Sequence, residues 1–65
     1  MIVLTEKRGE IAIQLTSHEL SILANALNEV CHGLPVPDFS SRIGATLEEV
    51  TALLKEIHAV AKSVT

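Results

Sequence analysis

Aromatic residues and cysteines are almost missing from this sequence. It contains one Phe, no Trp, no Tyr and one Cys among 65 residues. Its core must therefore be aliphatic, and a single cysteine cannot form a disulfide within the chain. A domain of this size buries only about 60% of the surface that its unfolded chain exposes. We expect one domain over residues 1–65, with part of its apolar area buried between subunits.

Basic residues and long apolar runs are also scarce. Five Lys and Arg stand against eight Asp and Glu, which gives a net charge of −3. Non-specific nucleic-acid binding and polybasic membrane attachment both need clustered positive charge, so this composition disfavours them. No apolar run approaches the roughly 20 residues of a membrane-spanning helix. A single Cys without a secretory signal predicts a cytoplasmic protein.

Residues 2–15 have the pattern of a β-hairpin. The segments IVLTEK and EIAIQL flank the dipeptide RG, whose glycine supplies the positive φ of a tight turn. A two-residue loop pairs Lys7 with Glu10, which are oppositely charged, and Leu4 with Ile13. Alternation then predicts one apolar face, made of Ile2, Leu4, Ile11, Ile13 and Leu15.

Two amphipathic helices are predicted after the hairpin, over residues 17–32 and 47–64. Apolar residues recur along both at helical spacing. A capping box, in which a threonine and a glutamate three positions later exchange hydrogen bonds, should open each helix. Gly33 predicts a left-handed stop for the first helix. The two capping pairs are Thr16 with Glu19 and Thr46 with Glu49.

A connecting segment, residues 33–45, separates the helices. Its two prolines, Pro35 and Pro37, force an extended path. Asp38 is expected to cap one helical turn over the sequence FSSRI. The segment is too apolar for a flexible tether, so we expect it to be packed, with two side chains pointing inward, Phe39 and Ile43.

These elements predict an α+β fold of the order ββα-turn-α, a two-stranded antiparallel hairpin followed by two amphipathic helices. We expect both helices to lie on the apolar face of the hairpin. A two-stranded sheet is marginally stable alone and leaves both edges unpaired. The sequence therefore predicts a homodimer through the sheet edge, in which the second strands of two chains meet in a four-stranded sheet.

The first helix also provides the candidate partner-binding residues. On a helical wheel Cys31 falls on the apolar arc, which favours a small buried hydrophobe over a nucleophile. Asparagine is a poor helix former, so two of them three residues apart suggest hydrogen bonds to the connecting segment or to another subunit. We predict that the polar arc contacts a protein partner, together with Arg42. This arc, the polar strip, consists of Asn25, Asn28, Glu29 and His32.

Catalytic and metal-binding patterns are not found. No CxxC or HxxxH spacing, glycine-rich phosphate loop, pair of carboxylates in a cleft or Ser-His-Asp set is indicated. We therefore expect no enzyme activity, no cofactor and no bound metal.

The sequence FSSRIGATLEEVTALLKEI has the shape of a helix-turn-helix unit at the start of the last predicted helix. Its second helix begins with Glu48 and Glu49, which would face DNA phosphates, and its few basic residues are Arg42, Lys55 and Lys62. A DNA-binding regulator is therefore the weaker alternative. A second alternative is an immunity or antitoxin-type inhibitor, whose acidic surface would cover a basic toxin.

The segments LANALNEVCHG and FSSRIGATLEEVTALL together resemble a group of small bacterial proteins of uncharacterised function, which carry ALNEVC-G and RIG-x-x-x-EE segments. The resemblance covers about the last two-thirds of the chain. It implies a bacterial, cytoplasmic setting and brings no known activity. The leading expectation is a non-enzymatic, homodimeric protein-interaction module.

Overall fold

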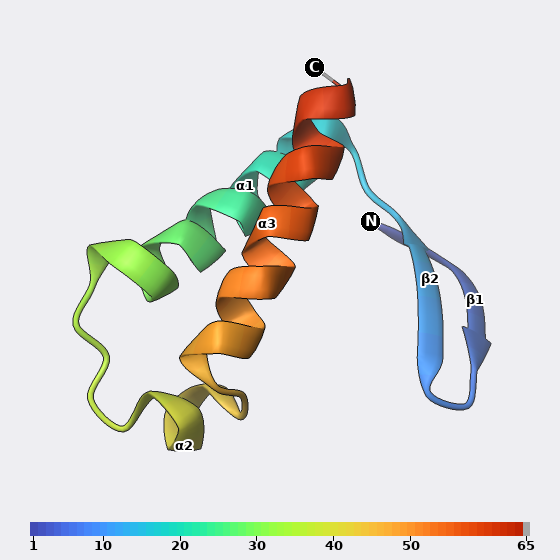
Figure 1. Cartoon of the computed structure of the whole chain (residues 1–65). Coiled ribbons are helices and arrows are strands. Elements are labelled where there is room, and N and C mark those ends of the chain that lie inside the picture. The colour runs from blue at the N-terminus through green and yellow to red at the C-terminus, as the bar shows by residue number, and fades with distance from the viewer. Residues whose placement is uncertain (65) are drawn as a thin grey trace.

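The computed structural model describes residues 1–64 and shows an antiparallel hairpin followed by helices (Figure 1). The predicted α+β class and the order of its elements are confirmed. The elements are β1 (Ile2–Lys7), β2 (Glu10–Gln14), α1 (Ser17–Asn28), the π-helical turn η1 (Glu29–Gly33), α2 (Phe39–Ile43) and α3 (Leu47–Val64).

Both predicted capping boxes are present. The Thr16 hydroxyl accepts a hydrogen bond from the Glu19 amide at 3.1 Å, and the Thr16 amide donates to the Glu19 carboxylate at 2.9 Å. Thr46 and Glu49 make the same two bonds at 3.1 and 2.9 Å. These bonds satisfy amides that the first helical turn leaves without partners, which explains why α1 and α3 begin where the sequence predicts.

The core lies between α1 and α3, which run in opposite directions, cross at an angle and contact each other (Figure 1). Half-buried Leu27 and Ile57 extend this contact. Cys31 is half-buried and accepts a hydrogen bond from the Thr51 hydroxyl at an Oγ1–Sγ distance of 3.9 Å. The buried residues within the described part of the chain are Leu20, Ala24, Val50 and Leu54.

The hairpin stands away from this core, so the prediction that both helices cover its apolar face is wrong (Figure 1). Every residue of β1 and β2 is exposed. Only the base of the hairpin approaches the helices, where Ile13 and Leu15 line a hollow with Leu20 and Val60. The physical reason is the short connection between β2 and α1, because its second residue, Thr16, is fixed as the N-cap of α1.

A β-bulge changes the predicted register of the hairpin. Pairing begins as predicted, with Lys7 opposite Glu10, and it shifts by one residue between Val3 and Thr5. Ile13 therefore pairs with Val3 instead of Leu4. Paired residues share a face, so Val3, Ile11 and Ile13, which we call the hairpin apolar face, lie on one side together with Glu6, the partner of Ile11. Ile2 joins the opposite face through its pairing with Gln14.

The first helix ends differently from the prediction. The last turn widens into η1, where the Leu34 amide donates to the Glu29 carbonyl at 2.8 Å. Leu34 is extended, and Gly33 has no positive φ, so the predicted left-handed stop at Gly33 is wrong. A five-residue hydrogen bond closes the turn without the left-handed residue that an α-helical C-cap uses.

The left-handed positions lie further along the connecting segment. Asp38 stands at the N-cap position of α2, whose sequence is FSSRI as predicted, but it has φ 53° and its side chain makes no capping hydrogen bond. Its carbonyl instead accepts from the Arg42 amide at 3.1 Å. Gly44, with φ 83°, ends α2. The two residues predicted to point inward differ, because Phe39 is half-buried while Ile43 is exposed.

The whole molecule is extended and flat. Its Cα radius of gyration is 13.1 Å, and its principal extents are 35 × 31 × 16 Å. A compact chain of this length would have a radius of gyration of about 11 Å. Its accessible surface is 5204 Å², whereas a compact monomer of the same mass exposes about 4,000 Å². Within residues 1–64, no helix combines the length and apolarity needed to cross a membrane.

Candidate interaction surfaces

The polar strip lies on the exposed side of α1 and η1, as predicted. Asn25 and Asn28 lie in the second half of α1, and Glu29 and His32 lie in η1. All four side chains are exposed. No side-chain hydrogen bond within residues 1–64 joins the asparagines to the connecting segment, so that expected contact is not made. Their amide groups remain available to a partner.

The π-helical turn gives the strip a distinct end. A π-turn places fewer degrees of rotation between successive residues than an α-turn, so His32 is displaced from the position an α-helix would give it. Gly33 leaves room for the Glu29 side chain, since a Cβ atom at Gly33 would collide with the Glu29 carboxylate. The predicted residues stay on one exposed side, with a local geometry that helical periodicity did not show.

Arg42 lies apart from the strip in the chain. It belongs to α2 and is exposed. No ion pair or side-chain hydrogen bond within residues 1–64 links Arg42 to the strip. The structure therefore does not join these five residues into one preformed site.

A second surface, which the sequence reasoning missed, is apolar and belongs to the helices. Leu23 in α1 comes one residue before buried Ala24, and Leu53 in α3 comes one residue before buried Leu54. Because the two helices run in opposite directions, these leucines flank the seam on the same side of the pair. Val60 lies seven residues after Leu53 and continues that side. We call the three exposed residues, Leu23, Leu53 and Val60, the helical apolar face.

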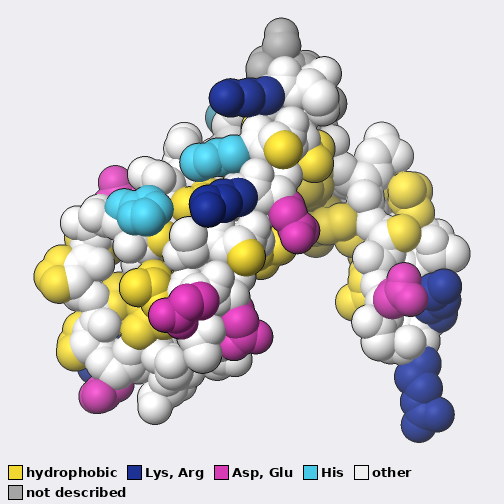
Figure 2. All heavy atoms as spheres, in the orientation of Figure 1, with side chains coloured by type: hydrophobic (Ala, Val, Ile, Leu, Met, Phe, Trp, Pro, Cys, Tyr) yellow, Lys and Arg dark blue, Asp and Glu magenta, His cyan; other side chains and the backbone are white. Residues whose placement is uncertain are grey.

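The helical apolar face turns toward the hairpin. Val60 lines the hollow at the base of the hairpin together with Ile13. Figure 2 shows hydrophobic side chains along this flank of the helices and on the hairpin, with an open space between them. Exposed apolar residues on both sides of an opening are typical of a surface that another molecule covers.

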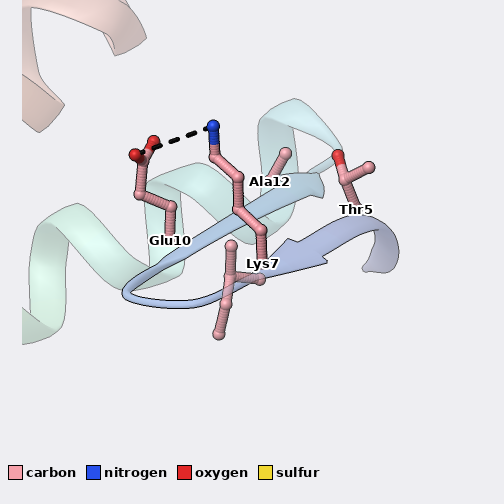
Figure 3. A pocket seen from close by; sticks show the side chains of 5 residues that line it. Thr5, Lys7, Glu10 and Ala12 are labelled. Atoms are coloured by element: carbon pink, nitrogen blue, oxygen red, sulfur yellow. Dashed lines mark ion pairs between the residues drawn. The ribbon is translucent and has the colours of Figure 1, made fainter.

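The opposite face of the hairpin is polar. Thr5, Lys7, Glu10 and Ala12 point to the same side and line a shallow hollow, which Ile11 also lines (Figure 3). Lys7 Nζ and Glu10 Oε1 form an ion pair at 3.8 Å, and both side chains are exposed. Exposed ion pairs contribute little stability. This side of the hairpin is polar next to the turn, while Ile2, at the other end of β1, adds one exposed aliphatic side chain to it.

The base of the hairpin is anchored to α1 through both strands. The amino-terminal nitrogen of Met1, next to β1, forms an ion pair with Glu19 Oε2 at 2.6 Å. The amino-terminal nitrogen also donates a hydrogen bond to this carboxylate, which is the main reason that the pKa of Glu19 falls from 4.5 to about 2. The hydrogen bond from the Thr16 amide is the second cause. Glu19 thus joins the start of β1 to the first turn of α1, while Thr16 joins β2 to the same turn.

The helix-turn-helix shape is present, with the charge distribution that the sequence predicts. Gly44 separates α2 from α3, and the first turn of α3 carries exposed Glu48 and Glu49. The hydrogen bond from the Thr46 amide lowers the pKa of Glu49, which keeps this carboxylate negative. Negative charge at this helix end opposes the approach of DNA phosphates. Within the described residues, no three His, Cys, Asp or Glu side chains are grouped to hold a metal ion.

The chain matches no protein-family model, and comparisons with curated proteins and with solved structures found no match.

Proposed function

We propose that this chain is a homodimeric, non-enzymatic protein-interaction module that acts in the bacterial cytoplasm. The exposed area of the single chain carries this proposal. The accessible surface of 5204 Å² exceeds that of a compact monomer of this mass by about 1,200 Å². A stable interface buries about 800 Å² or more on each partner. The excess is therefore larger than the area that one subunit buries in a standard interface.

The chemistry of the exposed area supports the same proposal. Large aliphatic side chains remain exposed on both the hairpin and the helices, including Ile11 at 69% and Val60 at 53%. Obligate homodimer interfaces are more apolar than the rest of a protein surface. A second copy supplies apolar cover of matching chemistry without any other partner.

The assembly is tested by sedimentation velocity across the micromolar range of chain concentration. We expect a species of twice the chain mass of 7.0 kDa. A species of single chain mass throughout this range would contradict the homodimer.

The polar strip is the surface we propose for a different protein partner. Its four residues offer amide, carboxylate and imidazole groups that are exposed and outside the α1–α3 core. Such groups suit hydrogen bonding to another protein's backbone or side chains. Affinity purification from the native host should recover a partner with the wild-type chain and lose it with Asn25→Ala/Asn28→Ala.

A matched control is Lys55→Ala/Glu56→Ala, which changes two exposed residues on α3. This control should retain the partner. If both double variants recover the same proteins as the wild type, the strip is not the partner surface.

An immunity or antitoxin-type inhibitor remains a candidate because exposed carboxylates gather at the start of α3, at Glu48 and Glu49. Inhibition of a basic toxin through these groups should weaken as salt rises. A DNA-binding regulator is the weaker candidate, since the same carboxylates oppose phosphates. A gel-shift experiment at low salt without retardation would dismiss it.

A further inference from the structure

We infer that the homodimer forms by reciprocal hairpin docking, in which the hairpin apolar face of each copy covers the helical apolar face of the other. This inference rests on the proposed homodimer and specifies its geometry. The occupant of each exposed face is a second copy of this chain, and the contact involves hairpin and helices instead of two sheet edges.

Two exposed faces of matching chemistry are present on the same chain. The hairpin apolar face offers Val3, Ile11 and Ile13, and the helical apolar face offers Leu23, Leu53 and Val60. All six are aliphatic, and each is at least 41% exposed. In a two-fold symmetric dimer the hairpin apolar face of the first copy meets the helical apolar face of the second. The same contact then forms a second time with the copies exchanged.

The chain's own hairpin is held away from its helices by its anchors. Only Leu15 and Thr16 separate β2 from α1, and Thr16 is bound in the capping box. Met1, next to β1, is tied to Glu19 in the same helical turn. Closing the hairpin onto its own helices would require these bonds to change. A second copy can fill the open space without changing them.

The exposed area of the chain favours face docking over edge pairing. The excess surface of about 1,200 Å² per chain exceeds the roughly 800 Å² that each partner buries in a standard interface. Edge pairing of two β2 strands adds backbone hydrogen bonds but leaves the hairpin apolar face and the helical apolar face open to water. Reciprocal docking covers both faces in one assembly.

Cysteine trapping tests this geometry, with Cys31→Ser as the background of every variant. The double variant Ile11→Cys/Leu53→Cys places one thiol on each apolar face. Under mild oxidation we expect a covalent dimer on a non-reducing gel. The matched control is Ile11→Cys/Ala59→Cys, in which the helical thiol is exposed on the far side of α3 and should give at least tenfold less covalent dimer.

Three outcomes would overturn the inference. A disulfide-closed monomer of Ile11→Cys/Leu53→Cys would show that the hairpin covers its own helices. Equal yields from this variant and the Ala59 control would show that the two faces do not meet. Efficient dimer formation by the single variant Ala12→Cys, in the middle of β2, with none from the face pair, would indicate edge pairing.

An experiment on the unmodified protein keeps the test independent of how the variants fold. In a mixture of isotope-labelled and unlabelled chains, intermolecular contacts between the Ile11 and Leu53 methyl groups should appear in a filtered NOE spectrum. A dimer by sedimentation that lacks these contacts would refute hairpin docking and leave the homodimer intact. A monomer by sedimentation would refute both.

Discussion

The helical pair and the hairpin contain the same types of aliphatic side chain, but these are buried in the helices and exposed in the hairpin. In α1 and α3, Leu20 and Leu54 are buried at 9% and 3% exposure. In the hairpin, Ile11 and Ile13 remain 69% and 41% exposed. Amphipathic patterning thus predicts that a face will be buried, but it does not say whether the same chain supplies the cover. The helical pair buries part of its apolar pattern against itself, whereas the hairpin leaves all of its own exposed.

The largest expected effect is on the core of the helical pair. Leu54→Ala removes the most buried leucine and should lower the free energy of unfolding by about 2–5 kcal/mol, because it leaves a cavity as well as removing apolar contact. Urea unfolding followed by circular dichroism measures this loss. Ile22→Ala truncates an exposed aliphatic residue of α1 and should cost less than about 1 kcal/mol. Equal losses would mean that the core does not lie where the structure places it.

The next effect separates the hairpin from the helices. Ile11→Asp puts a charge on the hairpin apolar face and should raise the dimer dissociation constant by about 100-fold or more, since the change occurs twice per dimer. Sedimentation measures this constant. Thr5→Asp places the same charge on the polar side of the hairpin, where Thr5 is exposed, and should change the constant by less than about threefold. A comparable loss from both variants would remove the distinction between the two faces.

A smaller effect on stability should distinguish the glycines that end η1 and α2. Gly44 has φ 83°, so Gly44→Ala should destabilise the fold by about 1–2 kcal/mol. Gly33 has no left-handed φ, and its new Cβ would meet only the mobile end of the Glu29 side chain. Gly33→Ala should therefore change the free energy of unfolding by less than about 0.5 kcal/mol. The reverse order of urea midpoints would show that Gly33 is the left-handed stop after all.

The smallest effect is a pH dependence at the anchored base of the hairpin. The amino-terminal nitrogen holds the pKa of Glu19 near 2, and Glu49 makes the same capping bonds without that partner. A lowered pKa means that the contribution of Glu19 to stability is complete above pH 4.5 and is lost as pH falls toward about 2. Carboxyl-carbon NMR titration should place Glu19 below Glu49.

Acetylation of the amino terminus is the control for this titration. It removes the positive charge beside Glu19, so the pKa of Glu19 should rise toward that of Glu49. Glu19→Gln should flatten the fall in stability between pH 4.5 and pH 2. An unchanged Glu19 titration after acetylation would show that the ion pair does not hold the base of the hairpin.

Features that depend on near neighbours were predictable from the sequence. Each capping box is complete within four residues, and Gly9 takes the positive φ of 82° that the RG turn requires. The polar strip is exposed because the residues opposite it on α1 are apolar and pack against α3. Local hydrogen bonds and helical periodicity determine these features, so they can be read from residues close together in the sequence.

Features that depend on competing geometries were not predictable. The bulge between Val3 and Thr5 and the π-helical turn at Glu29 each insert one residue into a regular hydrogen-bond pattern. The sequence carries no strong signal for either, since the energies of the regular and the irregular patterns are close. Asp38 likewise begins α2 with a left-handed backbone conformation and without the expected side-chain hydrogen bond.

By itself the sequence determined which segments become strands and helices, where the helices begin, and which side of each is apolar, because these properties follow from neighbours a few residues apart. Only the tertiary structure decided that the helices bury their apolar sides against each other while the hairpin stays apart. That choice follows from the direction of the chain at Leu15 and Thr16, next to which the capping bonds and the Met1–Glu19 ion pair lie. The pattern of side chains shows which surfaces are apolar. The direction of the chain at this junction determines whether the chain's own helices can cover the hairpin.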